Sequence, residues 1–210
     1  MFITFEGIEG CGKTTQIALL AGKLSAAGAE VVCTHEPGGT RAGTAIRKIL
    51  LQSESGPLNP VTELLLFSAS RSQLVSSVIM PALLEGKVVL CDRFYDSTRA
   101  YQGHGRGLDL ELIRQTIDIA TGGLTPDRTI LLDMPAEAGL DRAMTRLMKE
   151  RTDEARFEEE GLKFHRLVRE GFLSIAAQEP ERVRIVDATG SVEEVHLRVM
   201  AALQDILPQG

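Results

Sequence analysis

The sequence predicts an α/β protein in which helices cover both faces of a five-stranded parallel sheet. Five short runs rich in β-branched and apolar residues have the composition of buried strands, and longer segments with helical spacing separate them. This alternation of strands and helices is typical of a parallel sheet. A glycine-rich segment also links the first run to a helical stretch, so the chain begins with a strand, a loop and a helix.

The predicted strands are spread along the whole chain. They cover residues 2–6, 30–34, 88–91, 128–133 and 183–187. Because each is separated from the next by a segment of helical spacing, we expect neighbouring strands to run in the same direction.

Local chemistry marks several helix boundaries. Asn59 before Pro60 combines an N-cap acceptor with a proline that suits the first helical position, so a long helix should begin there. Pro81 should kink or end that helix, because proline lacks an amide donor and clashes one turn back. Ser191 and Glu194 have the spacing of a capping box for a C-terminal helix. The apolar stripe of that helix is formed by Val195, Val199, Ala202, Leu203 and Ile206.

Glycines shape the expectations for two further segments. A helix is predicted from Phe157 onward, although Gly161 and Gly171 each cost about 1 kcal/mol relative to alanine, so it needs tertiary support. The apolar positions of this helix after Phe157 are Phe164, Val168, Phe172 and Ile175. The glycine-rich segment 103–107 and the charged segment 149–156 are predicted to be mobile loops. Both are too short to divide the chain, so residues 1–210 should form one domain.

Composition excludes several classes of protein. Lys and Arg total 23 against 29 Asp and Glu, a net charge of −6, so no general positive field favours nucleic acid or an anionic membrane. No apolar run approaches the roughly 20 residues that span a bilayer, and the first residues have the pattern of a strand instead of a basic leader. The three cysteines lack the spacing of a disulfide framework or a zinc site. We therefore expect a cytoplasmic protein with reduced thiols.

Residues 7–14 read GIEGCGKT, which has the spacing of the P-loop. Glycines let consecutive backbone amides converge on phosphate oxygens, and the following helix N-terminus adds partial positive charge. Lys13 would bridge the outer phosphates, and the Thr14 hydroxyl would bind Mg²⁺. The motif predicts the P-loop NTPase fold with ATP bound. The nucleotide contacts should be Gly7, Ile8, Glu9, Gly10, Cys11, Gly12, Lys13, Thr14 and Thr15.

Other P-loop proteins offer alternative functions. A guanine-nucleotide switch needs an Asn-Lys-x-Asp motif, but the only asparagine in the chain is Asn59, which precedes Pro60. A non-enzymatic ATP-binding module stays open, although it assigns no role to the arginine-bearing segments. One of these is Asp92-Arg93, at the end of an apolar strand, where open α/β sheets bind ligands. A strand-end salt bridge is the alternative explanation for this pair.

Several motifs together carry a closer likeness. Besides the P-loop, they are EPGGT at 36–40, LFSASR at 66–71, DRFYDSTRAYQG at 92–103, LDMP at 132–135, RFE at 156–158 and VDA at 186–188. In this order, and over nearly the whole length, the chain resembles the thymidylate kinase family. The resemblance implies transfer of a phosphoryl group from ATP to dTMP, giving dTDP and ADP for dTTP synthesis, by a homodimer. A related deoxynucleoside or nucleotide kinase and a P-loop nucleotide switch are the alternatives.

The resemblance also implies an acceptor site. Arg47 and Arg93 would bind the 5′-phosphate, since a guanidinium fork suits phosphate oxygens. Phe67 would stack on thymine, with Arg71 one turn later reading the base, although a core position is the ordinary alternative for Phe67. Tyr101 would crowd a ribose 2′-hydroxyl. The implied substrate contacts are Glu36, Arg47, Phe67, Arg71, Arg93, Ser97, Thr98, Tyr101 and Gln102.

The same likeness implies the catalytic and metal-binding residues. The implied catalytic set is Lys13, Arg93, Arg156, Glu9 and Asp92, and Thr14 and Asp92 are the implied Mg²⁺ ligands. Family members without an arginine in the P-loop place one in a mobile lid, here about residues 142–156. We expect Arg156 to fill this role. Arg142, Arg146 and Lys149 are explained equally well as a solvated helix face. His35 and Ala155 depart from the residues often found at their positions.

Overall fold

In the computed structural model, which describes residues 1–52, 56–150, 156–158 and 160–207, the sheet has the predicted strands. They are β1 (Phe2–Glu6), β2 (Val31–His35), β3 (Val88–Asp92), β4 (Arg128–Asp133) and β5 (Val183–Asp187). All pairings are parallel, in the order β2-β3-β1-β4-β5. The central position of β1 places the loop that follows it in the middle of the carboxyl edge of the sheet.

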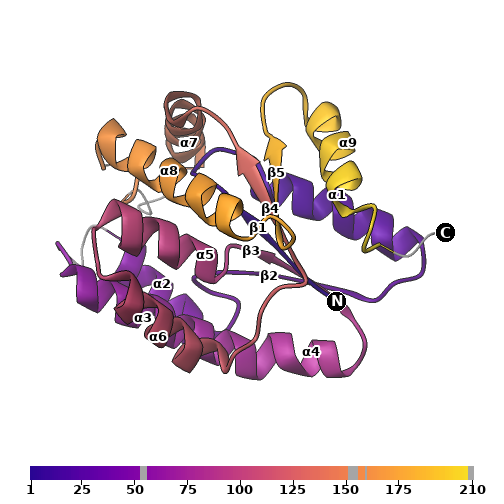
Figure 1. Cartoon of the computed structure of the whole chain (residues 1–210), viewed down its shortest axis with the longest axis horizontal. Coiled ribbons are helices and arrows are strands. Elements are labelled where there is room, and N and C mark those ends of the chain that lie inside the picture. Colours follow the sequence, from indigo (N-terminus) through magenta and orange to yellow (C-terminus); the bar gives the residue numbers. More distant parts are fainter. Residues whose placement is uncertain (53–55, 151–155, 159, 208–210) are drawn as a thin grey trace.

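Helical segments alternate with the strands, as Figure 1 shows. They are α1 (Lys13–Ala26), α2 (Arg41–Leu51), α3 (Pro60–Leu74), η2 (Val75–Ile79), α4 (Met80–Leu84), α5 (Tyr95–Thr98), η3 (Arg99–Gly105), α6 (Leu110–Thr121), α7 (Ala136–Glu150), α8 (Leu162–Gln178) and α9 (Val192–Leu203). The segments η2 and η3 are π-helical. None of the helices within the described part of the chain combines the length and apolar character needed to cross a membrane.

Side chains of the central strands alternate between two buried clusters. Ile3 and Leu90 pack in the cluster that includes side chains of α1, α8 and α9. Phe2, Val89 and Cys91 belong to the other cluster, with side chains of α3, η2, α4 and α6. Because successive strand residues point to opposite faces, the two clusters show that helices cover both faces of the sheet.

The predicted helix boundaries are confirmed where side chains cap the backbone. Asn59 accepts a hydrogen bond from the backbone nitrogen of Val61 at 2.9 Å. Ser191 and Glu194 form the reciprocal capping box. The regular helix begun at Pro60 ends at Leu74 and passes through the π-helical segment η2 before Pro81. The interruption therefore falls about one turn before Pro81, where a proline removes an amide donor.

Two predictions for glycine-containing segments are corrected by the structure. Residues 103–105 of the predicted loop are helical, because η3 continues to Gly105 and packs against α8, and only Arg106 and Gly107 lie beyond the helix. A methyl group on Gly105 would lie 2.7 Å from Phe164 Cε2, so this glycine permits close helix packing. The second error concerns Phe157, which precedes its predicted helix. That helix begins at Leu162, and Gly161 serves as its extended N-cap residue.

Replacing Gly105 with alanine tests this packing. Its backbone does not require glycine, but the added methyl group meets Phe164 and also Val168 Cγ2, 3.1 Å away. We expect Gly105→Ala to lower the free energy of unfolding by about 1–3 kcal/mol, as for other overpacked sites. Gly22→Ala is the control, because Gly22 is on the exposed face of α1 and an added methyl group has no neighbour within 4 Å, so alanine should stabilise the protein by about 0.5–1 kcal/mol. Urea unfolding measures the free energy of unfolding of both variants, and an unchanged value for Gly105→Ala would contradict the packing argument.

Candidate active site

The P-loop joins β1 to α1 and encloses the amino group of Lys13. Gly7 and Gly10 have φ of 136° and 73°, and a side chain at either would meet a backbone carbonyl, of Leu132 at 2.4 Å or of Gly139 at 2.1 Å. Lys13 Nζ donates to the carbonyl oxygens of Gly7 and Ile8 at 3.1 and 3.0 Å. The loop thus has the glycine-dependent backbone and the inward lysine that a phosphate cradle requires.

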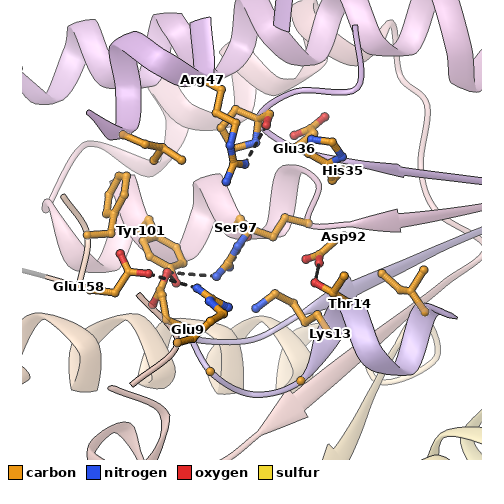
Figure 2. Close-up of a pocket in the computed structure, with 18 of the residues that line it drawn as sticks. Glu9, Lys13, Thr14, His35, Glu36, Arg47, Asp92, Ser97, Tyr101 and Glu158 are labelled. Carbon is orange, nitrogen blue, oxygen red and sulfur yellow. Dashed lines mark hydrogen bonds and ion pairs between the residues drawn. The ribbon is translucent and has the colours of Figure 1, made fainter. Parts of the chain in front are cut away.

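A cavity of about 920 Å³ opens beside the P-loop, at the carboxyl edge of the sheet (Figure 2). Its walls come from the P-loop, the ends of β2 and β3, and the helical segments α2, α3, η3 and α7. Predicted site residues on its wall are Glu9, Gly10, Gly12, Lys13, Thr14, Thr15, Glu36, Arg47, Phe67, Asp92, Arg93, Ser97, Thr98, Tyr101 and Gln102. Its volume suits a small-molecule site.

Thr14 and Asp92 meet at the rim of this cavity, as Figure 2 shows. Thr14 Oγ1 donates to Asp92 Oδ2 at 2.7 Å. A hydroxyl and a carboxylate oxygen are the hard donors that Mg²⁺ prefers. No group of three or more His, Cys, Asp or Glu that could hold a metal occurs among the described residues. Two protein ligands fit a magnesium ion that completes its shell with water and phosphate oxygens.

Arg93 lies in a strained conformation between the P-loop and the rest of the cavity. Its φ is 68°, and no other non-glycine among the described residues has a positive φ. Its guanidinium donates to Gly7 O at 2.9 Å and to Ser97 Oγ at 3.1 Å. The buried Glu6 carboxylate accepts hydrogen bonds from Phe94 N at 2.8 Å and from both the amide and hydroxyl of Ser97. These contacts stabilise the strained turn, since such strain is retained where surrounding structure determines it.

Glu9 binds the second terminal nitrogen of the Arg93 guanidinium, Nη2, whereas Gly7 and Ser97 bind Nη1. Its Oε1 accepts from Tyr101 Oη at 2.5 Å and from Arg93 Nη2 at 3.1 Å, and its Oε2 lies 3.4 Å from His165 Nδ1. Burial alone would raise the pKa of Glu9, but Arg93, His165, Lys13 and Tyr101 hold it well below its usual range. Glu9 is therefore ionised at neutral pH. His165 was not predicted from sequence, because a buried histidine beside Phe164 has no local signal of its own.

Of the two residues predicted to contact the base, Phe67 is on the cavity wall and Arg71 lies behind it. Phe67 lines the cavity, and its ring centroid is 6.1 Å from that of Phe157. Arg71 is buried, pairs with Glu36 at 2.7 Å and donates to Thr98 Oγ1 at 3.0 Å. Its Nη1 atom has no hydrogen-bond partner within the described residues. A buried donor without a partner is costly, so it suits a site completed by a ligand acceptor.

The predicted lid residues divide into two groups. Arg142 and Arg146 on α7 line the cavity. Arg156 does not reach it: Nη2 of Arg156 contacts Glu63 Oε2 at 2.9 Å, and Nη1 donates to Leu50 O at 2.8 Å. The reason is electrostatic, since Glu63 is fully buried and the nearby Arg156 guanidinium neutralises it. Arg151 and Ala155 lie outside the described residues.

Phe157 and Glu158 also line the cavity, and the sequence analysis assigned them no substrate role. Burial, followed by repulsion from Glu9, raises the pKa of Glu158. Arg146 Nη2 lies 3.5 Å from Glu158 Oε1, so α7 and the 156–158 turn meet at this wall. The sequence could have indicated a substrate role for Phe157 and Glu158 only through their position in the RFE motif at 156–158.

An anion cradle on β1–α1 and an arginine-bearing wall on the same cavity define a P-loop kinase of small phosphorylated substrates. A family profile for thymidylate kinase matches residues 5–199. The thymidylate kinases of Citrifermentans bemidjiense and Geobacter sulfurreducens are each 52% identical, over 97% and 99% of this chain and 91% and 98% of their own lengths. The crystal structure of thymidylate kinase from Ehrlichia chaffeensis, 38% identical, superposes with a TM-score of 0.77 over 97% of this chain and 98% of that one. The chain belongs to the thymidylate kinase family.

The buried Glu6 makes stability depend on pH. Burial, followed by repulsion from Asp96, raises the pKa of Glu6 to about 7 from 4.5. A raised carboxyl pKa means that the folded state binds the proton more tightly, so the contribution of Glu6 to stability is greatest below pH 4.5 and is lost as the pH rises through about 7. We expect the stability of the wild type, relative to Glu6→Gln, to fall by about 3 kcal/mol between pH 4.5 and 8. Urea unfolding across this range measures it, and parallel pH profiles would contradict it.

Proposed function

We propose that this chain transfers the γ-phosphoryl group of ATP to dTMP, giving dTDP and ADP for dTTP synthesis. Family membership supports this reaction. The observation that carries it is the single cavity in which the P-loop and the Arg93 guanidinium face one space. One triphosphate on the loop and one monophosphate at Arg93 would then lie close enough for direct transfer. A related nucleotide kinase and a P-loop switch are the alternatives.

The donor side uses the P-loop. Backbone amides of the loop bind the β- and γ-phosphates, and Lys13 exchanges its carbonyl contacts with Gly7 and Ile8 for phosphate oxygens. Thr14 and Asp92 would hold Mg²⁺, which when bound offsets the negative charge of the phosphates. Thr15 extends the nucleotide contacts along the first turn of α1.

The acceptor side uses residues of α2, α3, α5 and η3, together with two residues that directly follow β2 and β3. Arg93 and Arg47 bind the 5′-phosphate of dTMP through their planar forks. Phe67 stacks on thymine, which suits a half-buried ring on the cavity wall. Tyr101 lies beside the sugar, fixed by its hydrogen bond to Glu9, and leaves little room for a 2′-hydroxyl. The remaining contacts to base and sugar come from Glu36, Arg71, Ser97, Thr98 and Gln102.

The reaction needs no strong general base. The second pKa of a phosphate monoester is about 6, so dTMP attacks largely as a dianion at pH 7. Glu9, with its depressed pKa, is an acceptor that holds Arg93 and Tyr101 and not a base. The work of the site is to align two polyanions and to stabilise charge on the transferred group.

The structure changes the choice of lid arginine. Arg156 would have to leave a buried carboxylate and a carbonyl to reach phosphate. Arg146 already lines the cavity on α7, with its side chain about half exposed. We therefore propose Arg146, and not Arg156, as the arginine that stabilises the transferring phosphoryl group.

Paired substitutions test this choice. We expect Arg146→Ala to lower kcat about 10³-fold while changing the affinity for dTMP only a few-fold, by analogy with arginine fingers. Arg156→Ala should lower kcat less than tenfold, since that side chain contacts Glu63. Steady-state kinetics with both substrates and a melting curve for each variant measure this. The opposite order of the two kcat values would restore the role to Arg156.

A substrate panel tests the function itself. A coupled assay with Mg²⁺, ATP and a series of nucleoside monophosphates and nucleosides should show the highest kcat/KM with dTMP, because the cavity offers an aromatic wall and arginines for one phosphate. A higher kcat/KM with a nucleoside or with another monophosphate than with dTMP would favour the related-kinase alternative. Nucleotide binding with no acceptor turnover would favour the switch.

The wider setting follows from family membership and surface properties. We propose a homodimer, for which the adjacent helices α3 and α6 offer exposed apolar side chains, namely Val61, Leu65, Leu110 and Ile119. We also propose a cytoplasmic location, where Cys11, Cys33 and Cys91, all free thiols here, would stay reduced. A net charge of −6 gives no support to a nucleic-acid or membrane partner.

A further inference from the structure

Gln102 presents only one end of its amide to the cavity. The residue belongs to η3, lines the cavity and is 1% exposed. Its amide nitrogen Nε2 lies 2.8 Å from Glu63 Oε1. Because a carboxylate accepts hydrogen bonds and cannot donate them, the NH₂ group must face Glu63 and the carbonyl Oε1 must point elsewhere. The amide therefore offers the cavity an acceptor.

Glu63 is itself fixed in place. It is 0% exposed on α3, and Arg106 contacts both of its oxygens, from Nε to Oε1 and from Nη2 to Oε2, each at 3.2 Å. Arg156 contacts Oε2 at 2.9 Å and is held in turn by the carbonyl of Leu50. Two guanidinium groups keep the carboxylate oriented, so its hydrogen bond dictates which way the Gln102 amide turns.

The helix places Glu63 next to the base position of the proposed site. Glu63, Phe67 and Arg71 are four residues apart along α3, so they share one face of the helix. Thr98, which accepts from Arg71, lines the cavity together with Gln102. The edge of a pyrimidine stacked on Phe67 would thus face two groups of the protein: the Arg71 guanidinium as a hydrogen-bond donor and the Gln102 carbonyl as an acceptor.

We propose that Glu63 is a positioning residue that sets base specificity, by holding the Gln102 amide with its carbonyl toward the pyrimidine. This inference rests on the proposed function. Thymine carries an N3–H donor that matches the carbonyl, whereas N3 of cytosine is an acceptor and would meet Gln102 Oε1 unpaired. To admit cytosine, the amide would have to turn over and set its oxygen against the Glu63 carboxylate.

A simpler role for Glu63 makes a different prediction. If it only neutralises Arg106 and Arg156 in the interior, its replacement should impair turnover of every acceptor equally. If it orients Gln102, its replacement should change the ratio between thymine and cytosine substrates. The kcat/KM ratio for dTMP over dCMP therefore separates the two roles.

Glu63→Gln tests the proposal, because the new amide has nearly the same shape but can face Gln102 with either a donor or an acceptor. We expect the dTMP/dCMP ratio of kcat/KM to fall at least tenfold. Glu111→Gln is the matched control, since Glu111 also accepts from an arginine, Arg114 at 2.6 Å, and a glutamine, Gln115 at 2.8 Å, but on the exposed face of α6. Its ratio should stay within twofold of the wild type.

A second substitution shows whether the effect passes through Gln102. Gln102→Met should lower the ratio as well, and adding Glu63→Gln to it should lower the ratio no further. If Glu63→Gln does not fold, as judged by circular dichroism, Glu63→Asp retains the charge for both arginines and withdraws the carboxylate from Gln102. The same fall in the ratio is then expected.

The outcomes are distinct. A folded Glu63→Gln or Glu63→Asp protein whose kcat/KM falls equally for dTMP and dCMP overturns the positioning role, while the proposed function stands. A wild-type protein that forms no dTDP from dTMP and ATP overturns the proposed function and this inference with it. A fall in the ratio that persists in the Gln102→Met background also contradicts the route through Gln102.

Discussion

The hydrogen bond from the Arg93 guanidinium to the Gly7 carbonyl joins the two halves of the site. The distance from Arg93 Nη1 to Gly7 O is 2.9 Å; Arg93 directly follows β3, and Gly7 is the first residue of the P-loop. Gly7 follows β1, and β1 pairs directly with β3, so the register of two central strands sets the distance between the two phosphate-binding regions. A shift of either strand would separate the donor phosphates from the acceptor.

Charge balance at this point decides how an acidic protein binds two polyanions. The net charge of −6 offers no general attraction, so the anion-binding groups must be concentrated. Arg93 and Lys13 lie near the largely buried Glu9, whose ionised carboxylate compensates them when phosphate is not bound. Glu6, beneath the same turn, binds backbone amides that hold the strained Arg93. The cations are thus kept in place by local acceptors instead of by solvent.

Sequence patterns could predict the parts of this architecture that depend on local chemistry. The five strands, the caps at Asn59 and Ser191 and the P-loop all follow from backbone and side-chain preferences of neighbouring residues. Motif positions likewise brought most predicted substrate residues onto one cavity wall. Arg71 lies behind that wall, where it pairs with Glu36, and no local pattern marks this pairing across 35 residues.

The misplaced features depend on long-range packing. Gly105 was predicted to lie in a mobile loop, but it is a contact point between η3 and α8, and only the position of Phe164 shows this. Arg156 stands in a lid-like charged stretch, yet Glu63, 93 residues earlier, binds it. The same buried carboxylate contacts Gln102 and Arg106. No local pattern marks a residue such as Glu63, whose partners come from two distant parts of the chain, residues 102–106 and Arg156.

The central claim is that Arg93 binds the acceptor phosphate opposite a donor held by the P-loop. A crystal structure with dTMP, Mg²⁺ and a non-hydrolysable ATP analogue tests it most directly. The account predicts the triphosphate along residues 7–14 and the dTMP phosphate within hydrogen-bond distance of Arg93, with thymine against Phe67. A dTMP molecule whose phosphate lies away from Arg93 and whose base lies away from Phe67 would contradict it.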